Sequence, residues 1–155
     1  FQGDMVPRVT YMGSPYSCAF SGKALTFFSS RNLASPELVE QRNIEERIDS
    51  VFYSDEYAAA IVRNTNGEYG SRLEVYKKDG THVLSKEFNF EYTHADFDGD
   101  LIILYNEDSC RIYNMSGTEK FDATFDFPVS KIRKGRFPGT LVVTGPQQMQ
   151  ELKLR

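Results

Sequence analysis

The strongest constraint on this chain is a sequence repeat at a fixed offset of 37 residues. Residues 73–81 (LEVYKKDGT) are matched by residues 110–118 (CRIYNMSGT). Three pairs of identical residues mark the offset: Tyr76 and Tyr113, Gly80 and Gly117, Phe88 and Phe125. Apolar residues alternate with polar ones on both sides of each glycine, which predicts strands joined by tight turns. A period of this length is typical of β-repeat architectures such as propellers, in which each repeat is one small antiparallel sheet.

A second repeated element consists of an aromatic residue, a short polar turn and an apolar run. Its copies begin at Phe20, Tyr53, Phe97 and Phe137. Small and Asx residues in the turns favour hairpins, and the apolar runs favour buried strands. The sequence therefore predicts an all-β, β-propeller-type repeat of about four blade units, at about residues 4–48, 49–92, 93–129 and 130–155.

The fourth unit ends at its third strand, residues 149–154, and so lacks one strand. Residues 8–12 are one candidate for the missing strand, which would close a ring of four units. The alternative, which we favour, is that the chain is the C-terminal half of a larger propeller, completed by a further segment or by a second copy in a homodimer. Residues 1–3 (FQG) are typical of an expression-tag remnant, which indicates that an upstream segment was removed.

One stretch carries conflicting signals. Residues 35–41 (SPELVEQ) have the Ser, Pro and Glu order of a helix start. Alignment with the other units instead makes residues 38–40 a third strand. We favour the strand, because Leu38, Val39, Ile44 and Ile48 do not keep helical spacing.

Composition excludes several classes of protein. A net charge of -4 argues against a general nucleic-acid binder, which needs a basic face. No apolar run approaches the roughly 18 residues needed to span a bilayer. The two cysteines, Cys18 and Cys110, lie in apolar, strand-like surroundings, which favours buried thiols over a disulfide bridge or a reactive site.

Residues 50–155 resemble an uncharacterised family from Gram-positive, mostly clostridial bacteria. The resemblance rests on the Asp-Gly-Asp turn at residues 98–100, on CRIYN before MSG at 110–117, and on the terminal LVVT and ELKL segments. Members of that family look like an N-terminal membrane anchor followed by an extracytoplasmic propeller-like domain. The resemblance implies a membrane-tethered bacterial surface protein and carries no known active site.

Catalytic and metal-binding patterns are weak in this sequence. Asp96, Asp98, Asp100 and Glu107 match the acidic positions of a calcium loop, but Leu101 replaces the glycine that the loop needs for its sharp turn. The two histidines, His82 and His94, have no partners at metal-ligand spacing. No nucleophile elbow or phosphate-binding glycine loop occurs. We therefore predict no enzyme activity, no metal and no cofactor.

One basic run stands out in this acidic chain. It comprises Lys131, Arg133, Lys134 and Arg136, followed by Phe137. A solvated face is the ordinary interpretation of such a run, and contact with an anionic surface or an acidic partner is the alternative.

The predicted binding surface follows from the geometry of a meander. The loop between the second and third strands and the connection to the next sheet lie at the same end of each sheet, which we call the rim end. The predicted binding residues there are Glu68, Tyr69, Tyr92, His94, Glu107 and Asp108. We expect an extracytoplasmic, non-catalytic interaction module that docks a protein or a cell-wall polymer. The alternatives are a carbohydrate-binding module and a structural or sensory domain that dimerises through the incomplete sheet.

Overall fold

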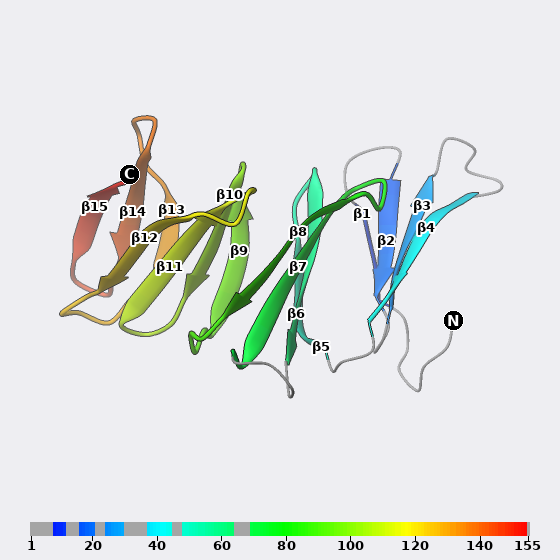
Figure 1. Ribbon diagram of the computed structural model, residues 1–155. Coiled ribbons are helices and arrows are strands. Elements are labelled where there is room, and N and C mark those ends of the chain that lie inside the picture. The colour runs from blue at the N-terminus through cyan, green and yellow to red at the C-terminus, as the bar shows by residue number, and fades with distance from the viewer. Residues whose placement is uncertain are drawn as a thin grey trace. The chain divides into compact units, whose positions relative to one another are not determined.

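The structure, a computed structural model, describes residues 8–11, 16–20, 24–29, 37–44, 48–63 and 69–154, and the elements within these ranges are all β-strands (Figure 1). In chain order the strands are β1 (Arg8–Tyr11), β2 (Tyr16–Phe20), β3 (Ala24–Ser29), β4 (Glu37–Asn43), β5 (Ile48–Tyr53), β6 (Tyr57–Arg63), β7 (Ser71–Lys77), β8 (His82–Phe88), β9 (His94–Asp98), β10 (Leu101–Tyr105), β11 (Ser109–Asn114), β12 (Glu119–Thr124), β13 (Lys131–Lys134), β14 (Thr140–Thr144) and β15 (Met149–Lys153).

These strands form four antiparallel sheets in which each strand pairs with its neighbour in sequence. The sheets are β1–β4, β5–β8, β9–β12 and β13–β15, and the last has three strands in the described part of the chain. The prediction of an all-β repeat with about four units is confirmed. Each sheet is a meander because its turns are too short for any connection other than a hairpin between adjacent strands.

The 37-residue repeat extends to individual hydrogen bonds. In the β7–β8 turn, the Lys77 amide donates to the Thr81 carbonyl at 2.8 Å, and the Lys77 carbonyl accepts from the Gly80 amide at 2.9 Å. The same two bonds recur in the β11–β12 turn, at 3.0 and 3.1 Å. Gly80 and Gly117 have φ angles of 88° and 81°, a region that glycine enters without steric cost. Equivalent turn residues therefore produce equivalent turns.

The first sheet corrects one part of the sequence interpretation. Strand β1 pairs with β2 as the first strand of its own sheet, so residues 8–11 are not the missing strand of the fourth sheet. Residue 12, the last of the predicted segment, lies outside the described residues. Residues 37–43 form a strand, as predicted, but β4 leads directly into β5 just as β8 leads into β9. It is therefore the fourth strand of its sheet and not the third. The connection after Phe20 correspondingly joins the second and third strands of the sheet, although its sequence resembles the first turns of the other three.

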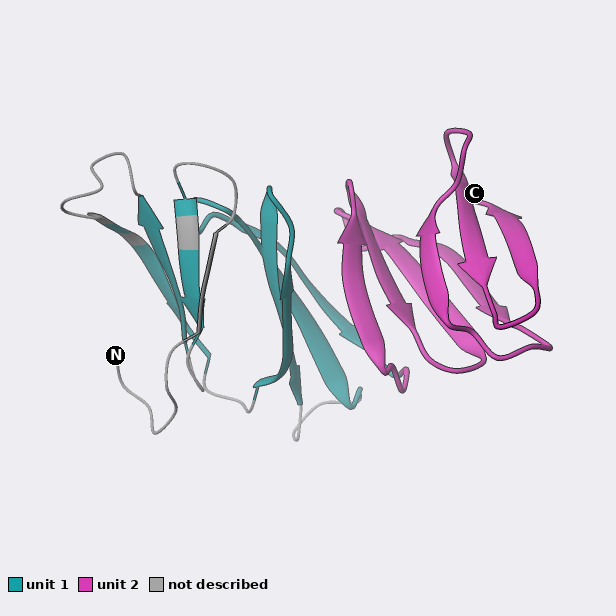
Figure 2. Ribbon diagram, turned by 180° about the vertical axis from the view of Figure 1, so that it is seen from behind, with its two compact units in different colours: residues 1–89 teal, residues 90–155 magenta. Residues whose placement is uncertain are grey.

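The chain divides into two compact units, residues 1–89 and residues 90–155 (Figure 2). Unit 1 contains the β1–β4 and β5–β8 sheets, and its buried cluster draws on both of them. Phe27 and Leu25 from β3 are completely buried, as are Ala58, Ala60 and Val62 from β6. The small alanine side chains leave room for the larger side chains of the first sheet, so the two faces can pack closely.

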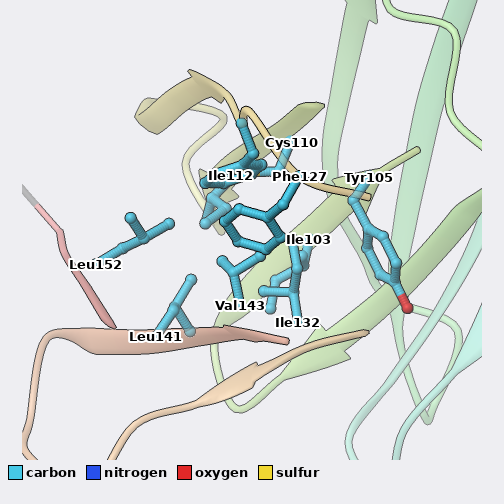
Figure 3. Close-up of a cluster of buried hydrophobic side chains, with 10 residues drawn as sticks. Ile103, Tyr105, Cys110, Ile112, Phe127, Ile132, Leu141, Val143 and Leu152 are labelled. Atoms are coloured by element: carbon cyan, nitrogen blue, oxygen red, sulfur yellow. The ribbon is translucent and has the colours of Figure 1, made fainter. Parts of the chain in front are cut away.

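Unit 2 has its own core between the β9–β12 and β13–β15 sheets. Figure 3 shows the side chains of this core converging from the two sheets. The buried residues are Ile103, Tyr105, Cys110, Ile112, Phe125, Phe127, Ile132, Leu141, Val143 and Leu152. Because β13 to β15 contribute four of them, the three-stranded sheet is an integral part of unit 2.

Both cysteines are buried free thiols, as predicted. The pKa of each thiol is raised from its ordinary value of 9.0 to about 12, chiefly by burial and, at Cys110, also by the negative charge of the nearby Asp122. The thiols therefore behave as small apolar side chains and not as nucleophiles.

The raised thiol pKa values predict a loss of stability in alkali. A group whose pKa is higher in the folded state keeps its full contribution below the unfolded pKa and loses it as pH rises toward the folded value. Between pH 9 and about pH 12 the unfolded chain ionises its thiols while the folded chain does not. We expect urea unfolding curves to show a steeper loss of stability above pH 9 in the native chain than in a Cys18→Ala/Cys110→Ala variant. Equal slopes would contradict the burial argument.

Candidate functional site

The rim end of the β9–β12 sheet gathers several polar side chains. Strands β9 and β11 begin there, and strands β10 and β12 end there. We call the two segments at this end, residues 91–94 and residues 106–109, the unit 2 rim. Glu91, His94, Glu107 and Asp108 are exposed, and Tyr92 is half-buried.

A single asparagine side chain holds the two rim segments together. The Asn106 side-chain oxygen accepts hydrogen bonds from the amides of Asp108 at 3.0 Å and Ser109 at 2.9 Å. Its side-chain nitrogen donates to the Glu91 carbonyl at 2.6 Å, which links the loop to the connection before β9. Asparagine suits this position because its amide can accept in a tight turn and donate across to the second segment at the same time.

The carbonyls of the acidic loop residues are also anchored. The Glu107 carbonyl accepts from the Val129 amide at 2.6 Å, and the Asp108 carbonyl accepts from the Phe125 amide at 2.7 Å. Of the two carboxylates, that of Asp108 accepts from the Ser109 hydroxyl at 2.8 Å and remains on the surface. The backbone of the loop is thus fixed from within the protein while its negative charges face solvent.

An aromatic pair lies beside these acids. The His94 ring stacks on the Tyr105 ring with 4.9 Å between ring centroids. Tyr105 is buried, and burial raises the pKa of its hydroxyl, with a smaller contribution from the negative charge of Asp96. The stack fixes the plane of the exposed histidine, so His94 presents a defined edge to solvent.

The structure brings together four of the six predicted binding residues. Tyr92, His94, Glu107 and Asp108 lie on the unit 2 rim. Tyr69 belongs to unit 1, in the connection between β6 and β7, and 39% of its surface is exposed. Glu68 lies outside the described residues. The choice of these residues as a binding site stays a prediction.

The calcium-loop pattern does not come together in space. Asp98 and Asp100 flank the β9–β10 turn, whereas Glu107 follows the far end of β10. The Asp96 carboxylate already accepts a hydrogen bond from the neighbouring Phe97 amide at 2.9 Å. Within the described residues, no group of three or more His, Cys, Asp or Glu side chains is placed to hold a metal ion.

Sequence reasoning missed a buried carboxylate in unit 1. Glu74 of β7 is 8% exposed and accepts three side-chain hydrogen bonds. The donors are Ser85 Oγ at 2.5 Å, Arg72 Nε at 2.7 Å and His82 Nε2 at 2.9 Å. A buried carboxylate with this many donors is electrostatically satisfied and has little capacity left for a ligand.

The 37-residue repeat shows that this carboxylate site is structural. Glu74 and His82 of unit 1 correspond to Arg111 and Glu119 of unit 2, which approach with 3.8 Å between Nε and Oε1. The acid and the base have exchanged strands while the cross-strand pair is retained. What the two copies share is a contact between a carboxylate and a nitrogen-bearing side chain that joins the third and fourth strands.

Glu74→Gln should therefore destabilise unit 1. The substitution keeps the size of the side chain but removes the charge that the Arg72 and His82 nitrogens face. We expect a loss of about 1 to 2 kcal/mol in the free energy of unfolding, measured by urea denaturation. Asp55→Asn, in the exposed β5–β6 turn of the same sheet, is the matched control and should change stability by less than about 0.5 kcal/mol. Equal losses of stability in the two variants would contradict a structural role for the hydrogen bonds around Glu74.

The comparisons with known proteins identify a family. A profile described as a family of unknown function, DUF5711, matches residues 1–154. The chain belongs to this family. No curated protein matches the DUF5711 chain at a significant level.

Solved structures resemble the DUF5711 chain in fold. Kluyveromyces lactis Hsv2p aligns with a TM-score of 0.55 and 9% identity, over 96% of this chain and 46% of that one. The HIRA fragment 644–1017 aligns with a TM-score of 0.59 and 10% identity, over 90% and 47%. Hydrazine synthase of Kuenenia stuttgartiensis aligns with a TM-score of 0.54 and 7% identity, over 93% and 44%.

These likenesses establish a β-propeller-type fold for the DUF5711 chain. The chain spans about half the length of the solved structures that it matches. Among the residues that the structure describes, no helix has the length and apolar character needed to cross a membrane.

Proposed function

We propose that this chain is a non-catalytic interaction module that docks a protein partner on the unit 2 rim. The proposal rests mainly on the structure of the rim loop. Hydrogen bonds from Asn106, Val129 and Phe125 anchor its backbone. The carboxylates of Glu107 and Asp108 nevertheless stay on the surface. Binding to a surface that is already ordered loses little conformational entropy. A braced loop with exposed side chains is therefore suited to recognition.

The charge of the rim specifies the kind of partner. Glu91, Glu107 and Asp108 are exposed acids, and Asp126 follows β12 at the same end of the sheet. Lysine or arginine side chains on a partner would complement them and accelerate association. His94 and Tyr92 supply the aromatic contact area that protein interfaces favour. From the resemblance of residues 50–155 to a membrane-anchored family, we also propose that the full-length protein lies at the outer face of a membrane, held there by a segment that precedes this chain.

A carbohydrate-binding module is the second candidate. Tyr69 of unit 1 is an exposed aromatic ring, and the adjacent Gly70 amide is fixed by the Asn89 side chain at 2.6 Å. An anchored, exposed tyrosine can stack on a sugar ring. A glycan array that includes cell-wall polymers, with Tyr69→Ala and Tyr92→Ala as variants, tests this candidate, and the absence of any hit would reject it.

Site-specific photo-crosslinking in cells tests the protein-docking proposal. A benzoylphenylalanine is placed at Tyr92 in one variant and at Ser116, on the opposite end of the same sheet, in a control variant. We expect a discrete protein adduct from position 92 that disappears on adding Glu107→Gln/Asp108→Asn and persists on adding Asp98→Asn/Asp100→Asn. Adducts of equal yield from positions 92 and 116, or no adduct from position 92, would reject docking on the rim.

A further inference from the structure

The last sheet carries a concentrated positive charge in an acidic protein. Between Asp126 and Glu151 the sequence contains no acid, yet it contains Lys131, Arg133, Lys134 and Arg136. All four are exposed. None takes part in the ion pairs found within the described residues.

The cross-strand neighbours of the three cations on β13 are all neutral. Lys131 lies opposite Thr144, and Arg133 lies opposite Val142. Opposite charges directly across a strand pair usually stabilise a sheet, and none is present here. The positive charges of β13 are therefore available to an anionic binding partner.

A projecting aromatic residue accompanies the charge. Phe137, at the tip of the β13–β14 hairpin, has 59% of its surface exposed. Figures 1 and 2 show this hairpin extending beyond the end of β15 in unit 2. We call residues 131–140 the basic hairpin.

The tip of the basic hairpin is well ordered. The Phe137 carbonyl accepts from the Thr140 hydroxyl at 2.6 Å, and the Gly135 amide donates to the Thr140 carbonyl at 2.8 Å. The Gly139 carbonyl accepts from the Leu154 amide at 2.7 Å, which fastens the tip to the chain after β15. The ordered tip therefore presents an apolar ring and neighbouring positive charges on one surface, and it is this combination, not the exposed ring alone, that indicates a contact surface.

The fold does not require this composition. The equivalent first turns of the two preceding sheets carry acids, namely Asp55 and Glu56 in one and Asp98 and Asp100 in the other. All three turns join the first and second strands of their sheets. The same type of turn forms with acidic residues in two sheets and with basic residues in the last. The fold therefore does not require the basic residues of the last turn.

We propose that the basic hairpin docks unit 2 on membranes rich in acidic phospholipids. Phe137 enters the headgroup region, and Arg133, Lys134 and Arg136, which lie nearer the tip than Lys131, pair with lipid phosphates around it. A convex tip with one apolar ring and flanking cations fits a flat anionic surface, whereas an acidic peptide would need a groove to lie in.

This placement leaves the unit 2 rim accessible. The Ser130 amide donates to the Thr144 carbonyl at 2.7 Å, and the adjacent Val129 amide donates to the rim carbonyl of Glu107. Thr144 ends β14 and Thr140 begins it, so the rim and the tip of the basic hairpin lie at opposite ends of the last sheet, with Lys131, opposite Thr144, at the rim end. A membrane bound at the hairpin would therefore not cover the acidic rim.

The absence of tryptophan from the chain allows a direct test. A Phe137→Trp variant carries a single tryptophan, at the tip, which is excited selectively over the tyrosines at the red edge of its absorption. With vesicles of phosphatidylcholine and phosphatidylglycerol, we expect a blue shift and quenching by brominated lipid, and neither with phosphatidylcholine alone. Tyr53→Trp, exposed in unit 1, should show neither change. No change in emission from Phe137→Trp with acidic vesicles would overturn the proposal.

Charge variants distinguish membrane docking from non-specific attraction and from binding to an acidic protein. Arg133→Gln/Arg136→Gln should weaken vesicle binding about 25-fold, since each cation near an acidic surface contributes about fivefold. Lys77→Gln/Lys120→Gln removes the same charge elsewhere and should have little effect. Phe137→Ser should weaken binding about tenfold. Equal loss in both double variants would show non-specific attraction, and binding to soluble polyglutamate but not to vesicles would assign the hairpin to an acidic protein. Either result overturns the proposal.

Discussion

Phe27→Ala should lower the free energy of unfolding by about 3 to 5 kcal/mol. Phe27 lies on β3, is completely buried, and contacts the Tyr76 ring of β7 with 6.0 Å between ring centroids. It therefore connects the two sheets of unit 1. Truncation removes this contact and leaves a cavity that the surrounding strands can fill only in part. Because domains of this size are stable by about 5 to 15 kcal/mol, the loss is a large fraction of the total.

The neighbouring residue supplies the control. Phe28 is only half-buried and points to the other face of β3. Phe28→Ala should cost less than half as much, in urea denaturation followed by far-ultraviolet circular dichroism. If both variants lost the same stability, Phe27 would not be the link between the sheets.

Gly80→Ala should lower the free energy of unfolding by about 2 to 4 kcal/mol, which combines backbone strain with overpacking. The glycine has a φ of 88°, and a Cβ added there would lie 2.5 Å from the Glu40 Cβ and 3.1 Å from the Phe27 ring. The turn is also fixed from β4, since Arg42 Nε donates to the Gly80 carbonyl at 3.0 Å. The turn cannot move away without breaking this bond.

A second glycine separates the two causes. Gly99 has a φ of 57°, and nothing lies within 4 Å of a Cβ added there. Gly99→Ala therefore introduces backbone strain without a steric clash. We expect it to cost about 1 to 2 kcal/mol. Thermal unfolding of the two variants measures the difference, and a Gly80→Ala cost no larger than that of Gly99→Ala would mean that the contact with β4 is loose.

Much of the fold could be predicted because its turns are encoded locally. Gly80 and Gly117 specify the same turn without help from distant residues, and the apolar runs of β6, β10 and β14 identify the buried strands. The meander geometry likewise places Tyr92 and Glu107 at one end of a sheet, since that depends only on strand order.

Other features depend on information that is not local. A polar turn followed by an apolar run occurs at the first turn of three sheets and at the second turn of the first sheet, so the local pattern alone places Phe20 at the wrong turn. The site around Glu74 depends on cross-strand register, which shifts between Val75 and Tyr76. The bridge from Asn106 to Glu91 depends on the spacing of two loops, which no local pattern specifies.

The central claim is that the unit 2 rim is a preformed surface, and amide hydrogen exchange tests it most directly. The amides of Phe125 and Val129 donate to the rim carbonyls of Asp108 and Glu107. We expect both amides to exchange as slowly as those of β10, and to exchange much faster in Asn106→Ala. Exchange of both amides at the rate of an unstructured peptide in the native chain would show that the rim is not braced, and would contradict the docking surface built on it.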